Sequence, residues 1–204
     1  MIYIRKDSIM NLPNKLTVLR MILVPAIIVV LALPVNTATS IIGAFIFLAA
    51  SLTDMLDGKL ARKHGLVTDF GKFMDPLADK LMVIAAMMSI IIRSRFDNTL
   101  FYIFVPLVTI TTFRELAVTS IRLVAIKNAN IVVAANMHGK VKTVTQIVCI
   151  MSALLEPVLA QISFLSFLSY YPITIVAAVI TLFMTVWSGW IYLSTYWKYL
   201  DQEK

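Results

Sequence analysis

Long apolar runs, separated by short charged or turn-forming segments, constrain this chain more than any other feature. Of its 204 residues, 60% are hydrophobic and 14% are charged, whereas soluble domains are about 45–50% apolar. The mean hydropathy is +0.88. Because a membrane-spanning helix needs about 20 mostly apolar residues, the chain has room for about six of them. The weaker, alternating pattern that is typical of membrane β-barrels is absent from these runs.

The sequence therefore predicts an all-α integral membrane protein that forms one transmembrane domain over residues 1–204. We expect a six-transmembrane-helix bundle that spans residues 16–33, 40–62, 72–92, 100–124, 143–168 and 173–196. Residues 1–15 mix polar and apolar side chains. We expect them to form a short N-terminal segment that lies on the membrane interface.

The distribution of basic residues predicts how the bundle is oriented. If the chain starts in the cytoplasm, every group of Lys and Arg falls on the cytoplasmic side except Arg93 and Arg95. This asymmetry follows the positive-inside rule and places both termini in the cytoplasm. The net charge of +7 is then accounted for by topology and by contact with anionic lipid headgroups. We expect a lipid bilayer and no nucleic acid among the partners.

Four aspartates interrupt the second and third apolar runs, at Asp54, Asp57, Asp75 and Asp79. A carboxylate near the bilayer centre costs about 2.5–3.5 kcal/mol on insertion scales, so such residues are functional candidates. Four carboxylates close together repel one another unless a strong positive charge lies between them. Clustered carboxylate oxygens are the ligands that hard divalent cations prefer. The sequence therefore predicts a metal site at a membrane surface.

The first two acids share one helix face with small residues. Asp54 and Asp57 are followed by Gly58 and Ala61, at spacings that place all four on one side of a helix. Small residues there leave room for a bulky ligand, although they also favour helix–helix packing in membranes. Packing explains the small residues but not the two acids. Arg62, at the end of this run, can bind a phosphate group through two hydrogen bonds.

The other two acids repeat this arrangement, since Gly71, Asp75 and Asp79 follow one another at four-residue spacing. Proline is tolerated in a first helical turn and disruptive later, so Pro76 predicts either a helix that starts near Asp75 or a kink there. A turn over residues 63–68 would bring the two acidic faces together. Four carboxylates in one pocket can hold two divalent ions, which suits phosphoryl chemistry.

This spacing resembles the signature of the CDP-alcohol phosphotransferases. Its eight fixed residues are Asp54, Asp57, Gly58, Ala61, Arg62, Gly71, Asp75 and Asp79. The resemblance implies that Asp54, Asp57 and Asp75 bind two Mg²⁺ or Mn²⁺ ions. It also implies that Asp79 closes the metal site and is the catalytic base for the acceptor hydroxyl. The residues that would accommodate the CDP moiety are Gly58, Ala61, Arg62 and Gly71. In this family, the acceptor attacks a CDP-linked alcohol and CMP leaves, and the resemblance suggests a homodimer.

The beginning of the chain resembles one branch of that family, the bacterial phosphatidylglycerophosphate synthases. Residues 11–20 read NLPNKLTVLR. The resemblance implies that Asn14, Thr17 and Arg20 help to line the nucleotide pocket. Independently of it, Pro13 and Asn14 are typical of a helix start.

Four cations in the second half of the chain predict a site for a phosphate group. Arg114 and Arg122 lie near the inner ends of apolar segments, and Lys140 and Lys142 begin the next one. An arginine that faces lipid is costly unless it reaches the interface. If all four face inward, they form a cationic pocket opposite the metals, which suits an acceptor that carries a phosphate. Glu115 can orient one of the arginines. The alternative is that these charges serve topology alone.

We therefore expect an enzyme of phospholipid biosynthesis in the bacterial cytoplasmic membrane, with its active site facing the cytoplasm. The resemblance implies transfer of the phosphatidyl group from CDP-diacylglycerol to glycerol 3-phosphate, which yields phosphatidylglycerophosphate and CMP. Other acceptors would make the chain a cardiolipin, phosphatidylinositol phosphate or phosphatidylserine synthase. A cation transporter is a further alternative, because intramembrane acids also form ion paths. Such paths usually lie near the midplane, whereas these acids cluster toward one side.

Overall fold

The computed structural model describes residues 12–64, 69–94, 98–129 and 137–197. Helices make up almost all of these segments. The six α-helices among the described residues are α1 (Leu12–Ala32), α2 (Thr37–His64), α3 (Asp69–Arg93), α4 (Asn98–Ala129), α5 (Met137–Leu159) and α6 (Pro172–Tyr196). A 3₁₀ helix, η1 (Ser163–Tyr170), connects α5 to α6.

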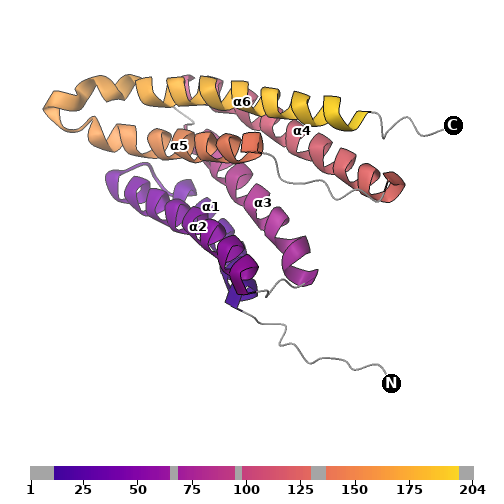
Figure 1. Cartoon of the computed structure of the whole chain (residues 1–204). Helices are drawn as coiled ribbons and strands as arrows, with labels where there is room; N and C mark the ends of the chain where they lie inside the picture. The colour runs from indigo at the N-terminus through magenta and orange to yellow at the C-terminus, as the bar shows by residue number, and fades with distance from the viewer. Residues whose placement is uncertain (1–11, 65–68, 95–97, 130–136, 198–204) are drawn as a thin grey trace.

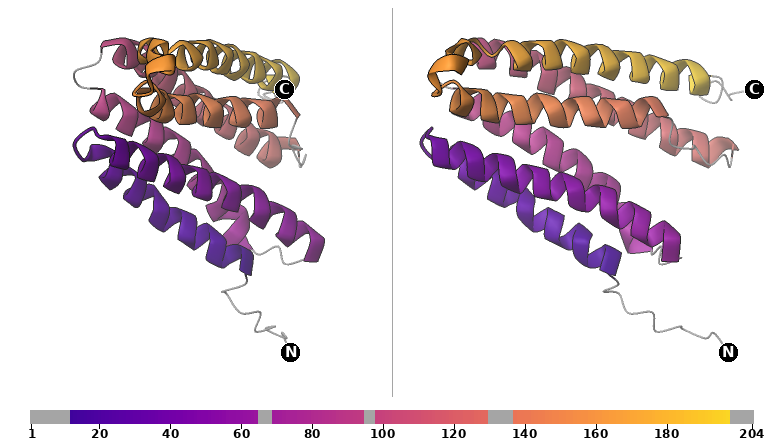
Figure 2. Two further views of the ribbon diagram at one scale, coloured as in Figure 1. Left: turned by 90° about the vertical axis from the view of Figure 1, so that its left-hand side faces the viewer. Right: turned by 60° about the vertical axis from the view of Figure 1, so that its left-hand side comes forward.

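Successive helices run in opposite directions, so their ends gather at two ends of the bundle (Figure 1). One end carries the first residues of α1, α3 and α5 and the last residues of α2, α4 and α6, and we call it the motif end. The other end, which we call the turn end, carries the connections from α1 to α2, from α3 to α4 and from α5 to α6. Figure 2 shows from two further sides that the helices diverge toward the motif end. Both ends of the helical chain therefore lie on the same side of the bundle.

The apolar core lies in the turn-end half of the helices. Helix α1 packs on α2 and α3, α4 packs on α3 and α6, and α5 packs on α2 and α6. The core residues come from the last turns of α1, α3 and α5 and the first turns of α2, α4 and α6. They include Ile27, Leu31, Phe47, Met87, Phe104, Ile150 and Leu154. This packing holds the six helices together at the turn end.

The distribution of side chains fits a membrane environment. Large apolar side chains lie on the outside, and Phe113, for example, is 75% exposed. Many polar side chains are buried inside instead, among them Asn14, Arg20, Glu115, Gln146, Glu156 and Thr185. Because lipid is an apolar solvent, lipid-facing apolar residues and inward-facing polar residues are what a membrane protein requires. The expected all-α class is confirmed for the described residues.

Four segments of the described chain are long and apolar enough to cross a membrane: Asn14–Ala32, Asn98–Ile121, Gly139–Leu159 and Ser163–Tyr196. Within the part of α2 whose side chains the structure describes, Thr37–Thr53 forms a shorter apolar segment. The number of helices therefore matches the sequence prediction, whereas six membrane spans and cytoplasmic termini remain predictions.

The expected span over residues 143–168 is too long, because α5 ends at Leu159 and η1 follows. Residues 12–15 belong to α1, and residues 1–11 lie outside the described chain, so the interfacial segment over residues 1–15 stays a prediction. The chain turns into α6 at Tyr171, whose φ of 55° is left-handed.

Pro76 lies inside α3, which begins at Asp69. Of the two alternatives that Pro76 predicted, a helix that starts near Asp75 is therefore wrong. Since proline has no N–H group, the carbonyl of the residue four positions earlier lacks its usual helical donor. Both acids of the third apolar run are thus carried by one helix that begins before them.

Glu156, at the turn end of α5, fixes the start of α6. This side chain is 1% exposed. Its carboxylate accepts hydrogen bonds from the backbone N–H groups of Ile173, at 2.8 Å, and Thr174, at 2.9 Å. The Thr174 hydroxyl donates a further bond to the same carboxylate. The first N–H groups of a helix have no partner within it, so Glu156 supplies acceptors that α6 lacks.

Candidate active site

Helix α1 presents a buried polar face to α3. Asn14, Thr17 and Arg20 follow one another at three-residue spacing, and all three are buried, with Arg20 at 0% exposure. The Thr17 hydroxyl donates a hydrogen bond to the carboxylate of Asp75. The residues expected to line the nucleotide pocket therefore lie on the α1 face that meets one of the expected metal ligands.

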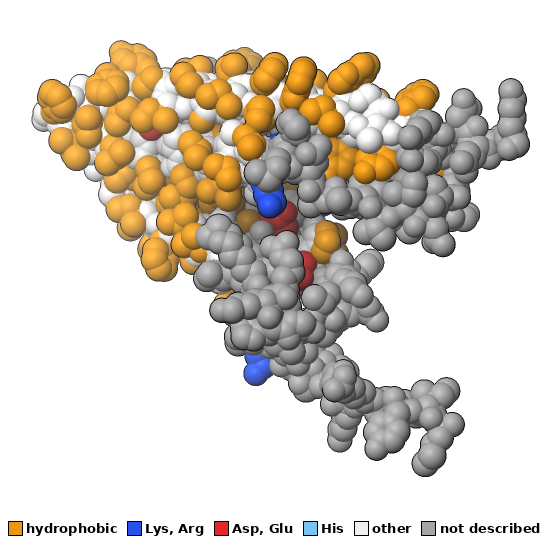
Figure 3. Space-filling model, viewed as in Figure 1, with side chains coloured by type: hydrophobic (Ala, Val, Ile, Leu, Met, Phe, Trp, Pro, Cys, Tyr) orange, Lys and Arg blue, Asp and Glu red, His pale blue; other side chains and the backbone are white. Residues whose placement is uncertain are grey.

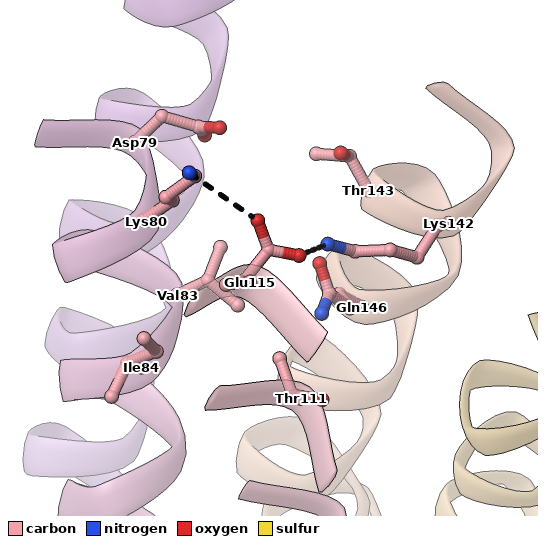
Figure 4. A pocket seen from close by; sticks show the side chains of 9 residues that line it. All are labelled: Asp79, Lys80, Val83, Ile84, Thr111, Glu115, Lys142, Thr143 and Gln146. Atoms are coloured by element: carbon pink, nitrogen blue, oxygen red, sulfur yellow. Dashed lines mark hydrogen bonds and ion pairs between the residues drawn. The ribbon is translucent and has the colours of Figure 1, made fainter. Parts of the chain in front are cut away.

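Asp75 and Asp79 lie one turn apart on α3, so they share a face of that helix. Figure 4 shows the Asp79 carboxylate directed into the space between α3 and α5. Both side chains are partly exposed. Two carboxylates at this spacing can bind to one centre, and oxygen donors of this kind suit Mg²⁺ or Mn²⁺.

A polar pocket lies beside Asp79, where α3, α4 and α5 meet (Figure 4). The side chains that line it are Asp79, Lys80, Val83, Ile84, Thr111, Glu115, Lys142, Thr143 and Gln146. Its volume is about 20 Å³, which is enough for about one water molecule. The lining places carboxylates, cations and an amide side by side where three helices meet.

Glu115 is the centre of this polar group. Its carboxylate is 2.9 Å from Nη1 of Arg114 and 3.8 Å from Nζ of Lys80, and it also accepts a bond from Lys142. These cations come from α4, α3 and α5, so a single carboxylate joins three helices. A buried charge is tolerated where opposite charges and hydrogen bonds surround it. Asp79 lies in the same pocket, so the described charged side chains here are three cations and two carboxylates, which leaves one positive charge in excess.

Arg114 is held from a second side by α6. Its Nη2 donates to the hydroxyl of Ser188 at 3.0 Å, and its guanidinium lies 5.6 Å from the centre of the Tyr192 ring. A Cβ atom at Gly189 would come within 3.1 Å of the Arg114 side chain. The glycine thus lets α6 approach closely, and the arginine is fixed in direction by three neighbours.

For the other two residues expected to bind the acceptor phosphate, Lys140 and Arg122, the structure shows no contact with this polar group among the described residues. Lys140 is exposed near the start of α5. Arg122 lies within α4, but its side chain is outside the described part of the structure. Of the four expected cations, the structure therefore brings together Arg114 and Lys142, and it confirms that Glu115 contacts Arg114.

For the remaining motif residues, the structure shows which helix carries them but not where their side chains lie. Asp54, Asp57, Gly58, Ala61 and Arg62 lie in the last part of α2, and Gly71 lies in the first turn of α3. Their side-chain positions are outside the described part of the chain. Among the described side chains, no group of three or more potential metal ligands occurs. A site built from all four aspartates remains a prediction.

Three residues of this region were not expected from the sequence, namely Lys80, Ser188 and Tyr192. In the sequence, Lys80 is one of the basic residues expected on the cytoplasmic side, and Ser188 and Tyr192 lie within the last expected span. Their contacts depend on how α3, α4 and α6 cross. Nothing in the local sequence distinguishes them from residues that face lipid or water.

The surface of the molecule shows the same division between its two ends. In Figure 3, apolar side chains cover the turn-end part of the face in view, and Lys, Arg, Asp and Glu side chains are visible mostly toward the motif end. The candidate site therefore lies toward the end of the molecule at which these charged side chains are visible.

The comparisons with known proteins agree with this geometry. The family described as CDP-alcohol phosphatidyltransferase matches residues 10–194. The match includes all six α-helices almost completely, and the chain belongs to this family of transferases.

Several bacterial relatives carry one name, CDP-diacylglycerol--glycerol-3-phosphate 3-phosphatidyltransferase. The protein of Bacillus subtilis (strain 168) is 39% identical over 201 residues, which cover 93% of this chain and 97% of the relative. The protein of Rickettsia felis is 32% identical, with the same coverage of both chains. A relative from Wigglesworthia glossinidia brevipalpis is 39% identical over 71% of this chain and 77% of its own length.

Proposed function

We propose that this protein transfers the phosphatidyl group of CDP-diacylglycerol to glycerol 3-phosphate, which yields phosphatidylglycerophosphate and CMP. The names of the relatives support the reaction. The structural observation that carries the proposal is the group of cations that Glu115 gathers beside Asp79. An acceptor with a phosphate group needs such a group of cations next to the residue that accepts its proton.

The four motif aspartates are suited to hold two divalent ions, Mg²⁺ or Mn²⁺. Asp75 and Asp79 offer carboxylates on one face of α3, and Asp54 and Asp57 lie on α2 at the same end of the bundle. Hard cations prefer such oxygen donors. When bound, the ions would neutralise the diphosphate and the charge that develops on CMP.

The transfer can be written with residues of this chain. The free hydroxyl of glycerol 3-phosphate loses its proton to the Asp79 carboxylate, and its oxygen attacks the phosphorus that carries diacylglycerol. The bond from that phosphorus to the bridging oxygen breaks, and CMP leaves with the electron pair. Asp79 fits the role of base because it points into the polar pocket, within a turn of Asp75.

The donor nucleotide is proposed to lie between α1, α2 and α3. Thr17 contacts Asp75, which supports a nucleotide pocket beside the metal ligands. The residues proposed to line it are Asn14, Thr17, Arg20, Gly58, Ala61, Arg62 and Gly71. The lipid chains of the donor would enter from the side, between helices whose outer surfaces are apolar.

The acceptor phosphate is proposed to bind Arg114 and Lys142, with Arg122 and Lys140 completing the set. The excess of positive charge around Glu115 favours an acceptor with a phosphate over an uncharged one. In the free protein, Glu115 holds Arg114 and Lys142 in place. The acceptor then meets cations that are already oriented, which lowers the entropy cost of binding.

The apolar outer surface supports a place in the bacterial cytoplasmic membrane. We propose six membrane spans, cytoplasmic termini and an active site that faces the cytoplasm, as the positive-inside rule predicts. We also propose a homodimer, on the basis of the family resemblance alone.

Release of CMP from CDP-diacylglycerol by the purified protein tests the function. We expect release with glycerol 3-phosphate, and none with glycerol, serine, inositol phosphate or phosphatidylglycerol. A chelator should abolish it, and Mg²⁺ or Mn²⁺ should restore it. Asp57→Asn should abolish it without unfolding the protein, while Gln161→Ala, at the turn end, should leave it unchanged. Undiminished release by Asp57→Asn, or a preference for another acceptor, would contradict the proposal.

A further inference from the structure

Arg93 is a fixed cation at the turn end, far from the candidate active site. It is the last residue of α3, and its guanidinium donates to the Thr39 hydroxyl at 3.2 Å, the Asn36 carbonyl at 3.4 Å and the Ser40 hydroxyl. All of these partners are neutral. Among the described residues, no carboxylate lies within ion-pair distance of Arg93, whereas Arg114 and Lys142 share one.

The partners of Arg93 belong to a rigid helix cap. The Thr39 N–H group donates to Oδ1 of Asn36 at 2.8 Å, and the Asn36 N–H group donates to the Thr39 hydroxyl at 3.2 Å. This reciprocal pair starts α2. The N-terminus of a helix carries a partial positive charge, so α2 does not offset the charge of Arg93, and the end of α3 offsets about half of it. The guanidinium is thus held in one orientation, and its described partners do not neutralise its positive charge.

An apolar groove runs beside this arginine. It has a volume of about 600 Å³ and is lined by the turn-end residues of α1, α3 and α4 together with the segment after α1: Leu31, Ala32, Leu33, Pro34, Val35, Ile91, Ile92, Arg93 and Phe101. Val35 and Arg93 also line a second cavity of about 270 Å³ that reaches Leu154 and Pro157 of α5. Arg93 is the single charged residue among the described residues that line either space.

We propose that this groove binds one anionic phospholipid from the leaflet at the turn end. Its phosphate diester pairs with the Arg93 guanidinium, whose planar donors match phosphate oxygens. One acyl chain lies in the groove, whose volume is within the range of about 300–1,000 Å³ typical of ligand sites. Charge complementarity selects the ligand, because the headgroup cation of a zwitterionic lipid competes for its own phosphate. This site is independent of the proposed reaction.

Retention of lipid by the purified protein in native mass spectrometry tests the proposal. The probes are phosphatidylglycerol and phosphatidylcholine with identical chains, added at equal concentration. We expect one phosphatidylglycerol molecule on the wild type, and roughly tenfold weaker retention for Arg93→Gln, since a charged pair at such a site is worth about 1.4 kcal/mol or more. Lys15→Gln, which removes an exposed cation from the motif end, is the matched control and should retain the lipid. CMP release by Arg93→Gln shows that this variant is folded.

A second variant tests the groove itself. Ile92→Trp narrows the groove and leaves Arg93 in place, and it should weaken retention of the two-chain lipid without changing the mass of the assembly. Equal retention by wild type and Arg93→Gln, or equal binding of both lipids, would overturn the proposal. Dissociation of an oligomer by Ile92→Trp would also overturn it, because the groove would then belong to an interface between two copies of the chain.

Discussion

Two buried glutamates, one toward each end of the bundle, have opposite surroundings. Glu115 is 9% exposed and Glu156 is 1% exposed. Glu115 contacts cationic side chains from three helices beside a polar pocket. Glu156 accepts hydrogen bonds from two backbone N–H groups and a hydroxyl at the start of α6.

The difference shows that burial of an acid inside a membrane protein does not by itself identify a functional site. The donors around Glu156 belong to the first turn of α6. They already donate to the Glu156 carboxylate, so they are not available to a substrate. The cations around Glu115 carry further N–H donors and an excess of positive charge. A substrate phosphate can therefore bind to the cations around Glu115 but not to the donors around Glu156.

The largest effect should come from Asp79→Asn. This substitution removes the carboxylate next to Glu115 and so tests whether the surroundings of Glu115, unlike those of Glu156, take part in the reaction. An amide cannot accept the proton of the acceptor and is a poorer metal ligand. The rate of CMP release should fall by about 10³-fold or more. A steady-state assay measures the rate, and an unchanged melting temperature shows that the fold persists. A loss of less than about tenfold would remove Asp79 from the chemistry.

Glu115→Gln should have the next largest effect, because Arg114 and Lys142 lose the anion that orients them. We expect kcat/KM for glycerol 3-phosphate to fall by about 100-fold. Glu115→Asp keeps the charge and should recover part of the activity. Glu156→Gln serves as the control and should change kcat/KM by less than about threefold. Similar losses in both Gln variants would break the distinction between the two glutamates.

Glu156→Ala should act on stability instead of catalysis. Two N–H groups of α6 and the Thr174 hydroxyl would lose their acceptor, at a cost of about 2 kcal/mol in the free energy of unfolding. Denaturant titration in detergent measures the change. Gln161→Ala removes an exposed hydrogen bond to Thr37 nearby and should cost less than about 0.5 kcal/mol. Wild-type stability of Glu156→Ala would show that the cap is not needed.

Lys80→Met should have the smallest effect. Lys80 is the most distant of the three cations, at 3.8 Å from Glu115, and its side chain is partly exposed. Solvent weakens such a pair, so kcat/KM should fall by roughly threefold. A loss as large as that of Glu115→Gln would mean that Lys80 contacts the substrate directly.

The sequence predicts the helices, and much of the site, because both depend on local patterns. Runs of apolar residues define six helices, and the spacing of Asp75 and Asp79 defines one face of α3. The end of α5 at Leu159 and the 3₁₀ helix that follows it could not be predicted in the same way. Residues 159–172 carry no charged side chain, and the entry into α6 depends on backbone geometry at Tyr171 and on the tertiary cap from Glu156.

Contacts between helices explain what the sequence left out of the site. That Glu115 can orient an arginine follows from two adjacent charged residues. Lys80 reaches the same carboxylate, and Ser188 accepts a hydrogen bond from Arg114, only because of the way α3, α4 and α6 cross. Such contacts join residues far apart in the chain, so no local spacing predicts them.

The most direct test of the acceptor site is the KM of each substrate for Lys142→Gln. Lys142 is buried, contacts Glu115 and lines the pocket beside Asp79. We expect the KM for glycerol 3-phosphate to rise by about 30-fold, which corresponds to the loss of one charge-assisted bond to phosphate, while the KM for CDP-diacylglycerol stays the same. An unchanged KM for glycerol 3-phosphate, or a rise for CDP-diacylglycerol alone, would contradict a phosphate site at this place.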